Sequence, residues 1–298
     1  MLKNYILSVW RQATRNKAFT IINISGLAIG MLACMLIAQF VLHEVTYDNF
    51  LEKKDRIFRV QLDRFEKGII ATQWAAGCAG IGPDLKANFP EVERMVRMHG
   101  GGATFAIGDL FYKEDNVYFA SEDFFKMFSI KLTEGIDSLV LKDPFRIVVS
   151  QSMARKYFGK ENPLGKILRA NGRREYEVSG VFEDLPVKSH MKIDALYSFV
   201  TYEKIVGNPI QTWDWDGFFT YVLLKEKTHA NELEAKLPAF VQKHENKTSN
   251  DPVTVVFHLQ PVSTIHLDSD YMEEFKANGN RQSVYFLSVV AVLIMIIA

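Results

Sequence analysis

Residues 18–42 form a run of 25 positions without a charged side chain, AFTIINISGLAIGMLACMLIAQFVL. A helix needs roughly 20 apolar residues to cross the hydrocarbon core of a bilayer, so this run predicts a transmembrane helix. A segment of mixed polarity follows at 44–283, and a second apolar run occupies 284–298. Because the second run is shorter than a full span, we expect it to be the start of a second membrane helix in a fragment of a longer membrane protein.

Charge at the N-terminus predicts the topology. Lys3, Arg11, Arg15 and Lys17 precede the first apolar run, and no acidic residue does. Basic residues in a short tail keep that tail in the cytoplasm, so we expect 44–283 outside the inner membrane and the second helix returning. The whole chain has 35 basic and 35 acidic residues. The outer segment is therefore slightly acidic, and a nucleic-acid partner is not expected.

The first apolar run is a poor signal peptide, because a signal h-region is only about 7–15 residues long and ends at a cleavage site. Met31–Cys34 loosely resembles a lipoprotein box, but it lies in the middle of the expected helix. The two cysteines, Cys34 and Cys78, fall in the membrane helix and the outer segment, so no intrachain disulfide is expected. Cys78 is interpreted as a small buried side chain, with a reactive thiol as the alternative.

Two membrane features are candidate sites. Residues 2–15 predict an amphipathic helix in the interface plane, with Trp10 at headgroup depth and Arg11, Arg15 and Lys17 near lipid phosphates. It would be either a simple lipid anchor or a cytoplasmic elbow that contacts a partner subunit.

Within the first membrane helix, Gly26 and Gly30 form a G-x-x-x-G pattern, which Ala33 extends. Small residues let helices approach closely in lipid, and Asn23 is expected to face another helix rather than lipid. The four residues are therefore predicted to pack against a helix. The alternative is that Gly is simply common in membrane helices.

The segment 44–283 shows strand and helix patterns without an internal repeat. Alternating or β-branched runs predict strands at 57–62, 103–107, 110–112, 117–119, 145–149, 175–182, 218–224 and 253–259. Helices are expected at 80–89, 124–128, 151–158 and 230–243, the second capped by Ser121–Asp123 and the third by Ser150. The fold class expected is an α+β periplasmic domain flanked by two transmembrane helices and preceded by an amphipathic interfacial helix.

Motifs that carry chemistry are scarce. The seven histidines form no H-E-x-x-H or other metal-ligand spacing, and Ser150 and Ser152 lack the G-x-S-x-G context. Asp214 and Asp216, which alternate with two tryptophans, could be paired carboxylates, but a surface turn with buried indoles is the favoured interpretation. Neither a catalytic residue, a metal nor a cofactor is expected.

Short motifs along the chain resemble, in order, those of one family. At the entry to the outer segment they involve Tyr47, Asp48 and Phe50, followed by Asp55, Arg56 and Arg59. The others are NKAF (16–19), INISGLAIG (22–30), FPEV (89–92), FFKMFS (124–129), ARKYFG (154–159), PLGK (163–166), VSGVFEDLP (178–186), SH (189–190) and IHL (265–267). In these motifs the chain resembles the MacB/FtsX-like permeases of ABC transporters, especially the long Bacteroidetes-type members, over essentially its whole length.

The resemblance implies a permease subunit that dimerises and works with a cytoplasmic ABC ATPase on a separate chain or domain. Nucleotide-driven movement would pass through the membrane helices to a periplasmic core domain, for export or efflux, with envelope partners in the periplasm or outer membrane. The family's domain is usually split, here loosely into a membrane-proximal part (44–102 plus 213–283) and a distal insert (103–212). The alternative is the periplasmic sensor region of a transmembrane signalling receptor, which has the same gross topology.

Overall fold

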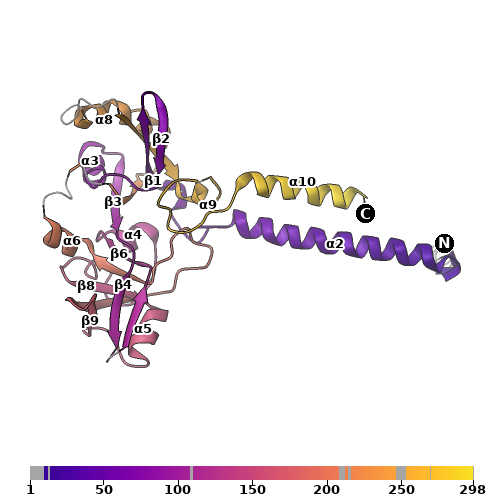
Figure 1. Ribbon diagram of the computed structural model, residues 1–298, viewed down its shortest axis with the longest axis horizontal. Coiled ribbons are helices and arrows are strands. Elements are labelled where there is room, and N and C mark those ends of the chain that lie inside the picture. Colours follow the sequence, from indigo (N-terminus) through magenta and orange to yellow (C-terminus); the bar gives the residue numbers. More distant parts are fainter. Residues whose placement is uncertain are drawn as a thin grey trace. The chain divides into compact units, whose positions relative to one another are not determined.

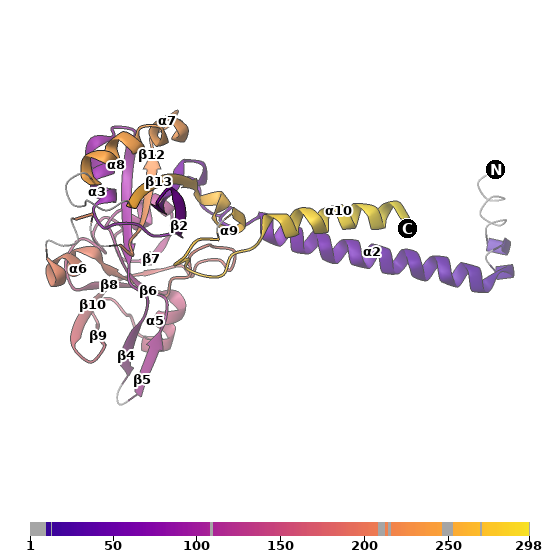
Figure 2. The same cartoon turned by 45° about the horizontal axis from the view of Figure 1, so that its top comes forward.

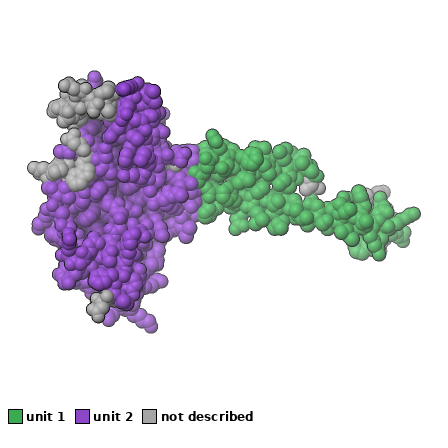
Figure 3. Space-filling model, viewed as in Figure 1, with its two compact units in different colours: residues 1–46, 279–298 green, residues 47–278 purple. Residues whose placement is uncertain are grey.

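The computed structural model describes residues 10–12, 14–107, 110–207, 212–213, 216–245, 253–268 and 270–297. The chain divides into two compact units, coloured separately in Figure 3. Residues 1–46 and 279–298 form a helical unit, and residues 47–278 form what we call the folded domain.

The helical unit contains two apolar helices, α2 (Lys17–Val45) and α10 (Arg281–Ile297). Of the described helices, α2 alone is long and apolar enough to cross a membrane, whereas α10 has 17 residues. Helix α10 begins before the apolar run that predicted it, because Asn280 Oδ1 accepts a hydrogen bond from the Ser283 amide at 3.0 Å. The predicted amphipathic helix at 2–15 lies largely outside the described residues.

The folded domain is built on one mixed sheet (Figure 1). Its strands follow the order β13-β1-β12-β3-β6-β11-β8-β10-β9-β4-β5, with β2 beside β1 and β7 beside β10. The pairs β6–β11 and β8–β10 are parallel, and the other pairs are antiparallel. The strands are β1 (Ile57–Glu66), β2 (Ile69–Trp74), β3 (Val92–His99), β4 (Ala103–Ile107), β5 (Leu110–Glu114), β6 (Val117–Ala120), β7 (Leu132–Glu134), β8 (Arg146–Ser150), β9 (Ile167–Ala170), β10 (Arg174–Phe182), β11 (Ala195–Ser198), β12 (Phe219–Leu224) and β13 (Val253–Pro261).

Short helices pack around this sheet. They are α3 (Ile81–Asn88), α4 (Phe124–Phe128), α5 (Gln151–Phe158), α6 (Phe199–Val206), α7 (Ala230–Glu234), α8 (Leu237–Glu245) and α9 (Ile265–Asp268), with 3-10 turns η1 (Lys54–Arg56) and η3 (Val262–Thr264). In Figure 2 the β4–β5 hairpin extends from the end of the domain opposite α7 and α8. Strands from 57–99 and 219–261 make one half of the sheet, and strands from 103–198 the other. The division into a membrane-proximal part and a distal insert stays a prediction.

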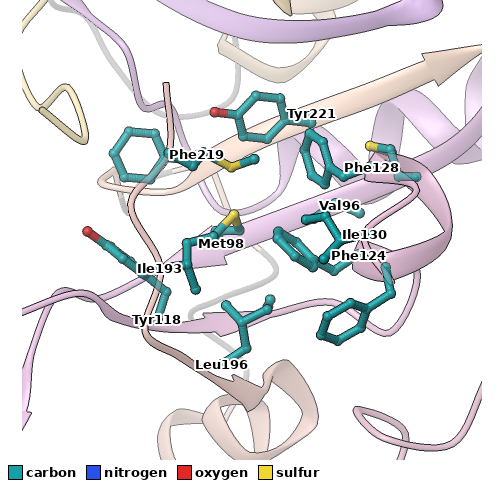
Figure 4. Close-up of a cluster of buried hydrophobic side chains, with 14 of the residues drawn as sticks. Val96, Met98, Tyr118, Phe124, Phe128, Ile130, Ile193, Leu196, Phe219 and Tyr221 are labelled. Atoms are coloured by element: carbon teal, nitrogen blue, oxygen red, sulfur yellow. The ribbon is translucent and has the colours of Figure 1, made fainter. Parts of the chain in front are cut away.

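Aromatic side chains fill the centre of the domain (Figure 4). Phe128 lies between Phe124, at 5.0 Å between ring centroids, and Tyr221 on β12, at 5.2 Å. A second cluster, with Leu233 and Leu237, packs under α7 and α8, and a third surrounds α5. These buried rings supply the apolar area that stabilises a fold whose two cysteines are both free.

Several predicted elements are confirmed and others are wrong. Ser150 caps α5 as expected, its Oγ accepting from the Met153 amide at 3.2 Å. The N-cap position of α4 is Asp123, within the predicted segment Ser121–Asp123, but no side chain there caps the helix. The Ser121 hydroxyl instead accepts from the backbone amide of Arg97 on β3. The helix expected at 230–243 is two helices. Pro238 explains the break, since a proline there could not donate to residue 234 in a continuous helix.

Candidate functional site at the entry to the domain

The first turn of the folded domain, directly after α2 in the chain, is held by a buried aspartate. Asp48 is fully buried and adopts a left-handed conformation, with φ of 56°, which aspartate tolerates better than most residues. Its amide donates to the carbonyl of Lys188 at 2.9 Å, and its Oδ1 accepts from the amide of His190 at 3.0 Å. The carboxylate therefore fixes the chain entry to the distant loop 188–190.

His190 connects this turn to the sheet. Its side chain is 1% exposed, and Nδ1 lies 2.9 Å from the same Asp48 oxygen. On the other side of the ring, Nε2 lies 2.9 Å from the Tyr221 hydroxyl and shares a hydrogen bond with it. Burial raises the pKa of Tyr221 far above its ordinary value, so the phenol stays neutral and can serve as a hydrogen-bonding partner.

Arg59 is the centre of a second group of buried polar contacts, which also includes Tyr221. It is fully buried on β1, and its Nη1 and Nη2 donate to the two carboxylate oxygens of Glu274 at 2.6 Å each. Nη2 also donates to Gln260 Oε1 at 2.7 Å, and the Arg59 guanidinium interacts with the Tyr221 hydroxyl. A bidentate arginine–carboxylate ion pair of this kind is among the stronger and more directional polar contacts in proteins.

The segment by which the chain enters the folded domain, at residue 47, also contacts the segment before its exit, residues 266–276. The Tyr47 ring stacks on His266 with centroids 3.3 Å apart, and Lys276 Nζ lies 4.6 Å from the centroid of the Tyr47 ring. Phe275, next to Glu274, stacks on Phe219 at 4.0 Å. The residues that hold both segments are called the entry joint below: Tyr47, Asp48, Arg59, His190, Tyr221 and Glu274.

The structure brings together some of the predicted entry residues and separates others. Tyr47, Asp48 and Arg59 belong to the entry joint, while Phe50 packs against the central aromatic cluster. Arg56 instead donates to Glu93 at 3.1 Å and to the Leu224 carbonyl at 3.2 Å. Asp55 is exposed in η1.

Sequence reasoning assigned no role to His190, Tyr221 and Glu274. The motif SH at 189–190 was a usable signal for His190. A further signal was the run Arg59, Gln61 and Asp63 on β1, three polar side chains at strand spacing that are all buried. Such a face needs polar partners from elsewhere in the chain.

The predicted membrane residues fall into two groups. Trp10, Arg11, Arg15 and Lys17 are all exposed, and Trp10 is 69% exposed. Gly30 and Ala33 are partly covered in the helical unit, together with Cys34, Ile37 and Val41, as a stripe at helical spacing. Asn23 and Gly26 are exposed.

Helix α10 packs against α2, and Cys34 Sγ lies 3.3 Å from the carbonyl oxygen of Ala291, to which it donates. Ser25 satisfies its hydroxyl within α2 by donating to the Ile21 carbonyl at 2.7 Å. A helix-packing role for Asn23, Gly26, Gly30 and Ala33 as a set stays a prediction.

The remaining candidates give no reactive centre in the described part of the chain. Cys78 is buried, and burial raises its thiol pKa to about 12, so the thiolate is disfavoured. Trp213 is half-buried, and its indole donates to Asp84 Oδ2 at 2.7 Å. Asp214 lies outside the described residues, and Asp216 pairs with Arg64 at 2.8 Å.

Comparison with known proteins defines the class. The family described as the MacB-like periplasmic core domain matches residues 20–240, and no curated protein matches the chain. Among solved structures, the chain is similar to a domain of a protein assigned as a permease from Porphyromonas gingivalis. The TM-score is 0.61 with 24% identity, over 71% of this chain and 91% of that one.

Two further structures are similar at lower scores. The periplasmic region of MacB from Actinobacillus actinomycetemcomitans has a TM-score of 0.49 and 16% identity, covering 73% of this chain and 95% of that one. The extracellular domain of the noncanonic ABC-type transporter YknZ from Gram-positive bacteria has a TM-score of 0.44 and 15% identity, covering 67% of this chain and 99% of that one.

The chain belongs to the family that carries the MacB-like periplasmic core domain, found in ABC transporter permeases. This confirms the family and the α+β fold class expected from its motifs.

Proposed function

We propose that this chain is the permease subunit of a MacB/FtsX-type ABC transporter, coupling cytoplasmic ATP hydrolysis to conformational change of the periplasmic domain for export or efflux. The observation that carries the proposal is the entry joint, which follows the membrane-type helix α2 directly in the chain. Family membership supports the permease assignment.

Coupling needs a stiff path from the membrane helix into the domain. Helix α2 is unbroken over 29 residues, about 44 Å at 1.5 Å per residue. After this helix in the chain, Asp48 and Arg59 of the folded domain are buried and hydrogen-bonded. Sliding such groups past their partners would leave buried polar atoms unsatisfied, at a cost of about 1–3 kcal/mol each. A displacement of residue 47 is therefore passed on to β1 and β12 rather than absorbed at the turn.

The proposal includes the partners and the location. The ATPase is a separate cytoplasmic chain, reached through Trp10, Arg11, Arg15 and Lys17, which are exposed. The permease dimerises in the inner membrane, where it is multi-pass with a cytoplasmic N-terminus. Its folded domain meets periplasmic or outer-membrane partners, and α2 and the N-terminal segment contact membrane lipid.

Hydrogen exchange of the complete permease with its ATPase, in lipid nanodiscs, tests the coupling. Adding a non-hydrolysable ATP analogue should change amide exchange in residues 186–191 and 271–276, which hold His190 and Glu274. Asp48→Ala and Tyr221→Phe should each remove that response while leaving the ATPase bound. Tyr221→Phe keeps the ring in the core and removes only the hydroxyl.

A matched control is Lys113→Gln, which breaks an ion pair with Asp115 whose side chains are 76% and 70% exposed. It should leave the nucleotide response intact. No nucleotide response in the unsubstituted protein, or an unchanged response in both entry-joint variants, would contradict coupling through this joint.

A further inference from the structure

A pocket of about 460 Å³ lies in the folded domain, away from the entry joint. One wall is the loop Gly100–Gly102 that follows β3. Another is the turn between β9 and β10, with Asn171 and Arg173, together with Arg174 at the start of β10. The floor includes Phe119 on β6, Tyr176 on β10 and Tyr197 on β11. A volume of this size falls in the range of small-molecule sites.

Two arginines line the pocket, and neither forms an ion pair within the described part of the chain. Arg173 and Arg174 are exposed and form none of the observed ion pairs. Arginines on the two strands beside β10 differ, since Arg169 on β9 pairs with Glu175 at 2.7 Å and Arg146 on β8 pairs with Glu177. Arginine holds carboxylate and phosphate groups well because its planar fork can donate two parallel hydrogen bonds.

The floor offers an aromatic surface, and one of its residues carries a buried hydroxyl. The ring of Tyr197 lies 4.2 Å from Tyr176 and 5.0 Å from Phe119 between centroids. Tyr197 is 4% exposed, and its hydroxyl has no hydrogen-bond partner among the described residues. Burial raises its pKa, so the group stays a neutral donor. A buried donor left unpaired is unusual in a native fold.

Glycine keeps the first wall free of side chains. Gly100 and Gly102 have φ of 103° and 96°, which other residues rarely adopt. A Cβ at Gly102 would also lie 3.3 Å from the carbonyl oxygen of Glu114. The backbone conformation thus favours glycine at these two positions, and glycine has no side chain that could fill the pocket.

We propose that this pocket binds a small amphiphilic anion, with a carboxylate or phosphate head held by Arg173 and Arg174 and an apolar stem on the aromatic floor. The inference is independent of the coupling role, because none of the entry-joint residues lines the pocket. It assigns a ligand-binding function to the part of the domain formed by β6, β9, β10 and β11.

Fluorine NMR of two probes tests the proposal, using the full chain in nanodiscs. N-trifluoroacetyl-L-phenylalanine presents a carboxylate, and 4-fluorophenyl phosphate presents a phosphate. At least one should bind saturably, and the tighter of the two identifies the head group. The double variant Arg173→Gln/Arg174→Gln should weaken that binding roughly tenfold or more, as expected for loss of charge-assisted hydrogen bonds. Both side chains are exposed, so the melting temperature should not change.

The controls separate this site from general attraction to a basic surface. Arg169→Gln removes a guanidinium from β9 outside the pocket and should leave binding unchanged. If the carboxylate probe binds, its neutral amide should bind about tenfold more weakly. The proposal is overturned if neither anion saturates, if the amide of a saturating carboxylate probe binds as well as the acid, or if Arg169→Gln matches the double variant. If inorganic phosphate competes for the pocket as strongly as the better probe does, the proposed contact between an apolar stem and the aromatic floor is refuted.

Discussion

Replacing Arg59 by methionine should be one of the most destabilising single changes in the folded domain. Arg59 is fully buried, and it donates to both carboxylate oxygens of Glu274 and to Gln260. Methionine fills part of the volume but donates no hydrogen bond. The substitution therefore leaves the Glu274 carboxylate, 12% exposed, without the cation that neutralises it.

The burial of the pair sets the size of the effect. Removing one partner of a buried ion pair costs roughly 3–5 kcal/mol, because the other charge stays buried and uncompensated. For a domain of this size, each kcal/mol lowers the melting temperature by about 2–4 °C, so a fall of roughly 6–20 °C is expected. Replacing Glu274 by methionine as well should recover part of the loss, since no lone charge is left behind.

Urea unfolding of the full chain in detergent, followed by tryptophan fluorescence, measures the change. Arg169→Gln is the matched control, since its pair with Glu175 is 61% and 57% exposed and should contribute less than about 1 kcal/mol. A loss below about 1 kcal/mol for Arg59→Met, or a double variant less stable than the single one, would refute the reasoning.

Three further outcomes follow from the folded domain. Gly180→Ala should lower the free energy of unfolding by about 1–3 kcal/mol, because the new Cβ would lie 2.8 Å from Val140 Cγ1 and 3.1 Å from the Glu134 carbonyl oxygen. Urea unfolding measures this change, and an unchanged midpoint would contradict the prediction. In a Cys34→Ala background, Cys78 should resist iodoacetamide at pH 8 until urea unfolds the domain, because burial raises its pKa to about 12; rapid alkylation of the folded protein would show the thiol to be accessible. Burial raises the pKa of Tyr118 from 10.0 to about 12, so the unfolded state releases this proton first and stability should fall by up to about 3 kcal/mol as pH rises from about 10 to about 12. Tyr118→Phe should reduce that fall, and an equal fall in the variant would refute the assignment.

Local patterns predicted the elements whose stabilising contacts are close in sequence. The alternation in 57–62 predicted β1, and Ser150 was recognised as the cap of α5 from its position before the helix. Strand β3 was missed because Glu93, Arg94 and Arg97 interrupt its apolar pattern. Arg97 is buried against the Ala79 carbonyl and Glu203, partners that only the folded chain reveals.

The entry joint could be predicted only in part, for the same reason. Family motifs pointed to Asp48 and Arg59, but the partners of these residues come from loops far along the chain. Asp48 meets His190 across 142 positions, and Arg59 meets Glu274 across 215. Periodicity and spacing report on neighbours within one element, so they carry no information about such pairs.

Purification of the complete gene product from membranes, with mass spectrometry of what accompanies it, tests the central claim most directly. The permease assignment predicts a stoichiometric ABC ATPase that is lost when Trp10, Arg11, Arg15 and Lys17 are replaced together by alanine. Retention of the ATPase in a control with Lys113→Gln would show that the loss is specific. A preparation without an ATPase, and with a signalling kinase in its place, would contradict the account and make the folded domain a sensor.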